Sequence, residues 1–378
     1  MSSRQPFHVL LTILLLFLLT GCWDARAIED VAFAVGFGYD KPESNDKIKV
    51  TYQFINTAAA LEAQTKKYIN ITRESNSVHE TIRDTSLQTY PVNSRHLKVL
   101  VIHHDLAEDI QIDKLINQVM KSNEVRRSCY VLISREPAQQ IFSNEIANIV
   151  PVQQLKVLSR TIGYSNKKLP ALTLGKMSSH LQEKVSFAIP EVRTDAGRNT
   201  LGGAFVVRGN LQKVVGHLNV RQTIGLNYLL GYEVGGTTTV NNDDKLRVFE
   251  VHDVKSKPKL TYSKQRGFEA SFALQLTGRL SEDWNEDENS FKGNYLKLVE
   301  KKVEEDIKKS IEDLLTILQS DLKADVLKLH DLARIHHFDE YKNIKKEWDE
   351  SIFPEIPIKV DVKATITDFG TKGATTKD

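Results

Sequence analysis

The chain of 378 residues contains 51 Lys and Arg and 49 Asp and Glu residues, so its formal net charge at pH 7 is only +2. This balance excludes the strongly basic composition typical of nucleic-acid-binding domains, and we expect no nucleic-acid partner. At about 150 residues per domain, the length predicts two domains, or three, each with enough residues for a hydrophobic core.

Residues 1–21 are predicted to form a lipoprotein signal peptide. A short start with one firm positive charge, Arg4, precedes an apolar run from Val9 to Leu19. The run is too short to span a bilayer, which takes about 20 apolar residues, and it matches the apolar region of a signal peptide. The following Thr20-Gly21-Cys22 completes a lipobox, in which the cysteine thiol takes a thioether-linked diacylglycerol.

Cys22 is therefore the predicted lipidation site, modified with acyl chains such as palmitate. At roughly 0.8 kcal/mol per buried CH₂, two acyl chains anchor a protein stably where one chain is marginal. The alternative is a plain secretory signal followed by a chance cysteine. Lipidation of Cys22 would leave Cys129 as the remaining cysteine, and its apolar surroundings predict a buried free thiol and no disulfide.

Residues 22–198 are predicted to form an N-terminal domain that contains a βαβ unit. Ser77 followed by Glu80 fits a capping box at the start of a helix. Two continuous aliphatic strands with a helix between them predict a sheet that is buried on both faces and at least locally parallel. The predicted elements are strands at 31–38, 47–55 and 67–72, a helix at 77–88, a strand at 97–102, a helix at 106–121, a strand at 129–133 and a helix at 138–150.

A polar stretch at 191–200 predicts the main domain boundary, and residues 199–378 form the predicted C-terminal domain. This part is expected to be rich in strands, and a further division near residue 265 is an alternative. The predicted elements are strands at 204–208 and 213–218, a helix at 223–230, and strands at 237–240, 247–254, 268–280 and 357–366.

One long amphipathic helix is predicted before the last strand. Its apolar residues recur in steps of three and four, and Glu and Lys fill the opposite face. The apolar residues are Leu296, Val299, Val303, Ile307, Ile311, Leu314, Leu318 and Leu322. A membrane-surface helix or a coiled coil would also show such a stripe, but the mixed charges favour a helix that packs on the chain's own sheet. The predicted fold class is α+β, with several domains, mixed sheets and packed helices.

The chain lacks the sequence motifs of common catalytic and cofactor sites. It has no phosphate-binding glycine loop and no Ser or Cys nucleophile motif. The histidine pairs His103-His104 and His336-His337 could suggest a metal, but adjacent residues point to opposite faces of a strand, so chance histidines are favoured. We expect a protein that is not an enzyme, with no catalytic residue, no metal site and no cofactor. The ligand-binding residues stay unknown.

The segment from Cys22 to Asp40 resembles the mature start of the Ger(x)C family, the lipoprotein C subunits of spore nutrient-germinant receptors. The resemblance extends through the chain to several further segments. These are Ser94–Leu100, Gly202–Val207, Val215–Asn219, Gly225–Gly231 and Trp348–Pro354.

Three positions depart from the family pattern. Ala27 stands where an acidic residue is usual, and Gln222 stands where Glu is usual. Leu327–His330 replaces a turn that usually contains glycine. The first two changes remove charges that could matter at a subunit contact, and the third concerns how the long helix ends.

The resemblance implies a non-catalytic, lipid-anchored subunit of a nutrient germinant receptor, required for spore germination. Its implied partners are the membrane-embedded A and B subunits and, through the diacylglyceryl anchor, the membrane itself. Its implied location is the outer face of the spore inner membrane. The alternative is a solute-binding lipoprotein of an importer, which predicts two similar βαβ-rich lobes around a ligand cleft. An envelope hydrolase is disfavoured because no nucleophile or metal set is visible.

Overall fold

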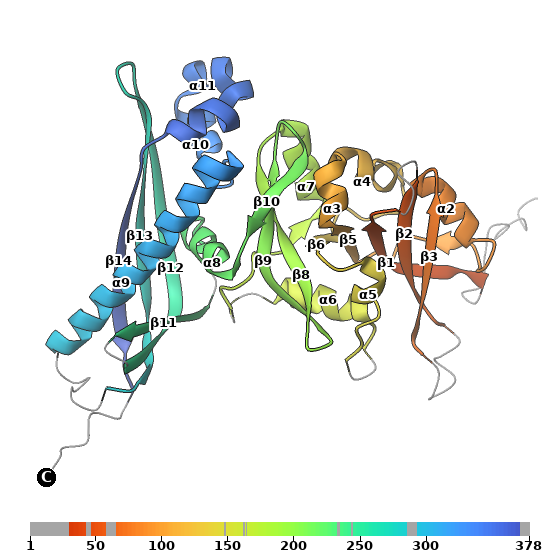
Figure 1. The fold of residues 1–378 in the computed structure, drawn as a ribbon, viewed down its shortest axis with the longest axis horizontal. Coiled ribbons are helices and arrows are strands. Elements are labelled where there is room, and N and C mark those ends of the chain that lie inside the picture. Colours follow the sequence, from red (N-terminus) through yellow and green to blue (C-terminus); the bar gives the residue numbers. More distant parts are fainter. Residues whose placement is uncertain are drawn as a thin grey trace, which may run out of the picture.

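Two β-sheets lie towards opposite ends of the longest axis of the molecule (Figure 1). The computed structural model describes residues 30–370 except 43–46, 58–65, 147–148, 162, 164, 233–234, 243–244 and 286–292. Together the two sheets and their helices give the expected α+β fold with several domains.

The first sheet has ten strands, and its centre is parallel. The strands are β1 (Ala32–Asp40), β2 (Ile48–Ile55), β3 (Tyr68–Ser75), β4 (Val92–Asn93), β5 (Val99–His103), β6 (Tyr130–Ser134), β7 (Leu172–Thr173), β8 (Phe187–Asp195), β9 (Arg198–Arg208) and β10 (Lys213–Leu218). The order is β10-β9-β8-β6-β5-β1-β2-β3, while β4 pairs with β1 and β7 with β6. Strands β1, β5, β6 and β8 run parallel, and antiparallel hairpins extend both sides.

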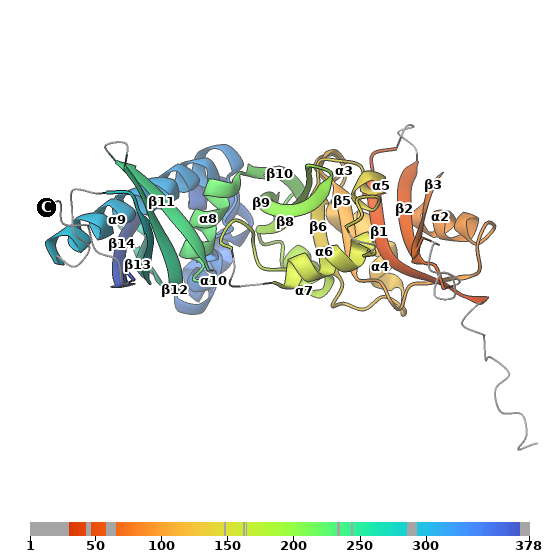
Figure 2. The ribbon, with the colours of Figure 1, turned by 90° about the horizontal axis from the view of Figure 1, so that it is seen from below.

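Helices cover both faces of this sheet (Figures 1 and 2). They are α2 (Val78–Thr85), α3 (His104–Asp109), α4 (Ile112–Lys121), α5 (Ala138–Ile141), α6 (Pro151–Arg160) and α7 (Leu174–Glu183). Along β5, Leu100 and Ile102 belong to a core with α3, α4 and α7, whereas Val99 and Val101 belong to a core with α5 and α6. The continuous aliphatic strands are thus buried on both sides, as expected of a parallel sheet.

Two helix predictions in this half were wrong in extent. The helix expected at 106–121 is divided into α3 and α4, with extended backbone at Ile110. The helix expected at 138–150 stops at Ile141, and a new helix begins at Pro151. Proline is favoured in the first turn of a helix, and it drives the preceding residue, Val150, out of the helical region, which explains why α6 begins at Pro151. The early end of α5 at Ile141 has no such signal in the sequence.

The second sheet has the order β11-β12-β13-β14 and carries the long helix on one face. Its strands are β11 (Gly236–Asn242), β12 (Lys245–Ser263), β13 (Gly267–Asp283) and β14 (Ile358–Asp368). The long helix is α9 (Gly293–Thr316), which continues as a π-helical segment, η3 (Ile317–Leu322). All eight stripe residues except the half-buried Leu296 are buried, and they share one core with the sheet. The prediction that this helix packs on the chain's own sheet is therefore confirmed.

Shorter helices complete the second half. Helix α8 (Val220–Leu229) lies between the sheets, and its partners include β9, α9 and β12. After η3 come α10 (Leu329–His336), α11 (Phe338–Ile344), and the short helical segments η4 (Lys345–Glu347), η5 (Trp348–Ile352) and η6 (Phe353–Glu355). None of the helices in the described ranges is long and apolar enough to cross a membrane.

The predicted boundary between residues 198 and 199 falls next to the turn that joins β8 to β9 in the first sheet. The alternative division near residue 265 falls in the turn of the β12–β13 hairpin, whose strands pair with each other. Leu169, Ala204, Val206 and Leu218 belong to the same core as α9 and the second sheet. The two halves are therefore joined by apolar packing.

Candidate functional site

Ionisable side chains gather where the parallel strands β5 and β6 end. His103 is the last residue of β5 and pairs with Ser134, the last residue of β6. Glu191 of β8 lies opposite Ile133 in the parallel ladder. In open α/β sheets, ligands bind outside the carboxyl ends of the strands, so this edge is the candidate site. We call it the β5–β8 edge; it consists of His103, His104, Asp105, Arg135, Glu191, Phe205 and His217.

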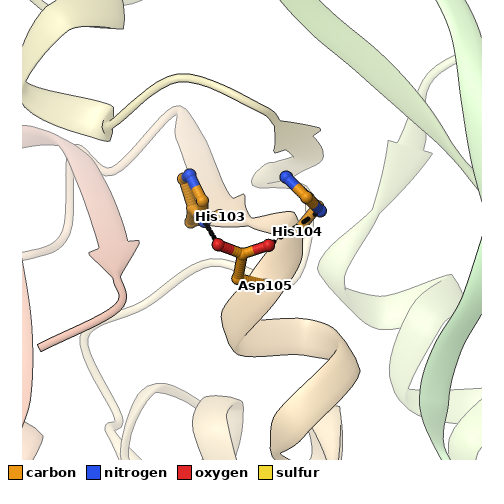
Figure 3. A group of neighbouring side chains, drawn as sticks. All are labelled: His103, His104 and Asp105. Atoms are coloured by element: carbon orange, nitrogen blue, oxygen red, sulfur yellow. Dashed lines mark ion pairs between the residues drawn. The ribbon is translucent and has the colours of Figure 1, made fainter.

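His103, His104 and Asp105 form its first group, at the junction of β5 and α3 (Figure 3). The chain turns from strand to helix between the two histidines, and their rings stack with centroids 4.9 Å apart. Asp105 Oδ1 lies 3.3 Å from His104 Nδ1, and its Oδ2 lies 3.9 Å from His103 Nδ1. The expectation that adjacent histidines point apart does not apply here, because the pair does not lie within one strand.

Glu191 is the centre of the second group. Its side chain is only 3% exposed, and it accepts hydrogen bonds from His217 Nε2 at 2.8 Å and Arg135 Nε at 3.2 Å. The ring of Phe205 lies between the two groups, 5.7 Å from the His104 ring and 4.8 Å from the His217 ring. The β5–β8 edge is therefore one continuous cluster of side chains from four strands and one helix.

The absence of a side chain at Gly203 leaves space for Glu191 and His217. Its φ of +88° favours glycine, and a Cβ atom there would overlap Glu191 Oε2 and lie 3.0 Å from His217 Nε2. The Gly202-Gly203 pair in the sequence thus has a structural reason beside a buried carboxylate.

A second buried cluster joins the two halves of the chain. We call it the Asp325 cluster; its members are Asp325, His330, Trp348, Asp349 and Ser186. The Asp325 carboxylate accepts hydrogen bonds from the backbone N–H groups of Leu327, Leu329 and His330 and from Trp348 Nε1 at 2.9 Å. Asp349 accepts one from the Asp325 N–H at 2.9 Å and one from Ser186 Oγ at 2.7 Å, and so links η5 to the first half.

Burial and pairing shift the pKa values of this cluster. Burial disfavours the charged forms of both Asp325 and His330. The hydrogen bond between their side chains and their opposite charges outweigh this effect, so the pKa of Asp325 is lowered and the pKa of His330 is raised. For Asp349, burial outweighs its hydrogen bonds from Asp325 and Ser186, and its pKa is raised. The cluster therefore holds a charged pair beside a carboxyl group that ionises less readily.

A cavity of about 350 Å³ lies beside the Asp325 cluster, between the halves. Its lining includes His180 and Phe187 from the first half and Tyr232, Lys328 and His330 from the second. This volume is at the lower end of the range for small-molecule pockets, about 300–1,000 Å³. The two halves that flank it differ in architecture, since the second is a four-stranded sheet with one long helix.

The residues that the sequence singled out lie in different places. Cys22, the predicted lipidation site, lies outside the described residues. Cys129 is a buried free thiol, and burial raises the pKa of that thiol. His336 is exposed at the end of α10, and His337 Nε2 lies 3.3 Å from the Leu260 carbonyl oxygen, so this second histidine pair is separate from the β5–β8 edge.

Sequence reasoning missed Glu191, His217, Asp325 and Asp349. For Asp325 the signal was present: an acidic residue stands between Ala324 and the aliphatic Val326-Leu327. A charge within an apolar stretch indicates a buried carboxylate with several donors. Glu191 and His217 are far apart in the sequence and meet only because β8, β9 and β10 are neighbours.

Comparisons with known proteins match both halves of the chain. Residues 24–194 match the family model described as spore germination protein N-terminal domain. Residues 202–370 match the model described as spore germination B3/GerAC like, C-terminal. Spore germination protein B3 of Bacillus subtilis (strain 168) is 31% identical over 99% of this chain and 100% of its own length. Spore germination protein A3 of the same organism is 31% identical over 94% and 96%, respectively.

A solved structure has the same fold. The crystal structure of the GerBC protein matches with a TM-score of 0.63 and 25% sequence identity, over 88% of this chain and 97% of that chain. Sequence and structure comparisons thus point to one family over nearly the whole length.

Proposed function

The chain belongs to the spore germination B3/GerAC-like family, and from that premise we propose that it is a non-catalytic, lipid-anchored subunit of a nutrient germinant receptor. The observation that carries this proposal is the similarity to spore germination protein B3 over the full length of both chains. A match to a single domain would support only a shared fold, whereas a match across both halves supports a shared role.

The anchor in this proposal is a diacylglyceryl group on Cys22, on the outer face of the spore inner membrane. The lipobox supports it. Ala32, at the start of β1, lies ten positions after Cys22, and an extended chain spans at most about 3.6 Å per residue. The anchor would therefore keep β1 within about 36 Å of the membrane.

The proposed partners are the membrane-embedded A and B subunits of the receptor. A lipid tether confines the protein to a layer beside the membrane and raises its effective concentration against these subunits, so modest interfaces suffice. The buried ionisable groups fit a role in architecture, since Asp325 is occupied by donors of the fold itself. On this basis the protein acts through its surfaces and not through a chemical reaction.

A Cys22→Ala substitution in the spore-forming host tests the proposal. The matched control is Cys129→Ala, which removes the other cysteine and leaves the lipobox intact. The measurements are membrane fractionation of spores and co-purification of the A and B subunits. Germination is measured with nutrients and, for comparison, with a trigger that acts independently of nutrients.

We expect Cys22→Ala to release the protein from the membrane fraction and to abolish nutrient germination selectively, while Cys129→Ala retains both properties. Nutrient germination that is untouched by deletion of the whole gene would refute the receptor role. If solute uptake failed instead, the importer alternative would replace it, although the dissimilar halves of the chain do not match its two similar lobes.

A further inference from the structure

We propose that His103, His104 and Asp105 bind a divalent transition-metal ion of the zinc class. The ligand atoms of these three residues all lie within 4.8 Å of one another (Figure 3). Imidazole nitrogens combined with carboxylate oxygens are the donors that Zn²⁺ and similar ions take in proteins.

His103 is already oriented as a ligand. Its Nε2 lies 2.8 Å from the carbonyl oxygen of Arg135, and since a carbonyl only accepts, Nε2 carries the proton and donates it. In the neutral ring, Nδ1 is then left with a free lone pair. It is buried, has no hydrogen-bond partner among the described residues, and faces Asp105 Oδ2. Metal-binding histidines are held in this way, with the second ring nitrogen donating to a carbonyl or carboxylate.

His104 and Asp105 complete the donor set on α3, and Glu108, one turn further on, lies beside His104. His104 Nδ1 lies 3.3 Å from Asp105 Oδ1 and 3.3 Å from Glu108 Oε1. The His104 ring also stacks on Phe205, with an angle of 18° between the planes, which restrains its rotation. Nitrogen and oxygen ligands at about 2.0–2.2 Å from a tetrahedral ion lie about 3.4 Å apart. The 3.3 Å between His104 Nδ1 and Asp105 Oδ1 already fits this spacing, whereas His103 Nδ1, 3.9 Å from Asp105 Oδ2, must move closer when the ion binds.

The same side chains could instead form an ordinary hydrogen-bonded group of two histidines and two carboxylates. That explanation accounts for the contacts of His104, but it leaves the buried His103 Nδ1 without a partner among the described residues. A buried acceptor without a partner costs about 1–3 kcal/mol, and a bound cation removes this cost.

The test is metal titration of the full chain, purified without a polyhistidine tag in detergent and stripped with a chelator. Co²⁺ is titrated first because its absorption reports nitrogen and oxygen ligands, and Zn²⁺ then competes for the site. The variants are His104→Gln and Asp105→Asn, and the matched control is His336→Gln, which removes an exposed histidine from α10. Thermal unfolding of each variant without metal shows whether it is folded.

We expect one ion per chain, displacement of Co²⁺ by Zn²⁺, and a Kd at least tenfold weaker in each site variant but unchanged in His336→Gln. Loss of a residue that only hydrogen-bonds a metal ligand already weakens metal affinity about 10–100-fold, so loss of a ligand itself must weaken the affinity at least as much. Absence of stoichiometric binding to the unmodified chain would overturn the proposal, as would equal affinity in a folded site variant. Neither readout depends on germination, so the result is independent of the proposed function.

Discussion

The His330–Asp325 pair makes the stability of this protein depend on pH in a definite direction. The pKa of His330 is raised above its ordinary value of 6.5 in the folded chain. Its pairing therefore stabilises the fold fully below about pH 6.5 and is lost as the pH rises through the folded pKa. We expect the free energy of unfolding, measured in urea, to fall as the pH is raised from 6 through this value.

His330→Gln tests the same pair directly. Removing one partner of a buried ion pair costs about 3–5 kcal/mol. We expect His330→Gln to lower the free energy of unfolding at pH 6 by this amount and to remove the decrease that the pairing causes at higher pH. The pKa of Asp325 is lowered from 3.8, so Asp325 stays charged across this range. His336→Gln, at an exposed position, is the control; an unchanged pH profile in His330→Gln would disprove the assignment.

Gly203 offers a second prediction at the level of single residues, with a control supplied by the chain. Gly203→Ala places a Cβ against Glu191 at a φ of +88°, whereas Gly197→Ala introduces a similar φ of +75° with no atom within 4 Å. The backbone cost of about 1–2 kcal/mol applies to both variants, and only Gly203→Ala adds the overlap. Denaturant unfolding should show a clearly larger decrease in the free energy of unfolding for Gly203→Ala than for Gly197→Ala. Equal decreases would contradict the described packing.

Among the helices and strands, α9 shows how a sequence pattern becomes packing. Ile307 lies in the middle of its apolar stripe and is 2% exposed, while Leu298 on the same helix is 49% exposed. We expect Ile307→Ala to lower the free energy of unfolding by about 2–5 kcal/mol and Leu298→Ala by less than about 0.5 kcal/mol. Urea denaturation measures both. A large loss for Leu298→Ala would mean that the outer face of α9 is also packed.

The sequence predicted these elements unequally, for physical reasons. Periodic apolar residues identified α9 and the aliphatic strands, and Ser77 does accept the Glu80 N–H at the start of α2. Strand β8 was missed because its polar end, Arg193–Asp195, looks like a linker when read locally, although it pairs with β9. The parallel pairing of β8 with β6 joins segments far apart in the sequence, and such pairing is invisible to a local pattern.

The departures from the family pattern also become understandable in the structure. Gln222 forms a full capping box with Asn219, so a neutral amide does what a carboxylate would do at this helix start. In the segment that lacks glycine, Lys328 adopts a φ of +63°. The three N–H groups held by Asp325 stabilise this turn. A sequence pattern alone does not reveal such compensation, because the donors and the acceptor meet only in the fold.

At the scale of the whole molecule, the two sheets are coupled and not merely linked. Val206 of β9 and Leu218 of β10 lie in the first sheet and share a core with α9 of the second. Arg208 of β9 also donates hydrogen bonds to the Leu322 carbonyl oxygen. Domains within one chain move independently unless their interface is large and apolar. Here the apolar core crosses the interface, so we infer that the halves fold as one cooperative unit.

Scanning calorimetry of the full chain in detergent tests this coupling, with one buried leucine shortened in each half. Leu100 lies in the first sheet and Leu274 in the second, and they are 0% and 1% exposed. Each Leu→Ala substitution lowers the free energy of unfolding by about 2–5 kcal/mol. In a coupled molecule, either substitution moves one single unfolding transition to lower temperature. If the halves were independent, Leu100→Ala would shift one of two transitions and Leu274→Ala the other. A single shared transition would mean that a contact made by one half changes the stability of the other half. The proposed receptor subunit would need this coupling in order to transmit a signal between its partners.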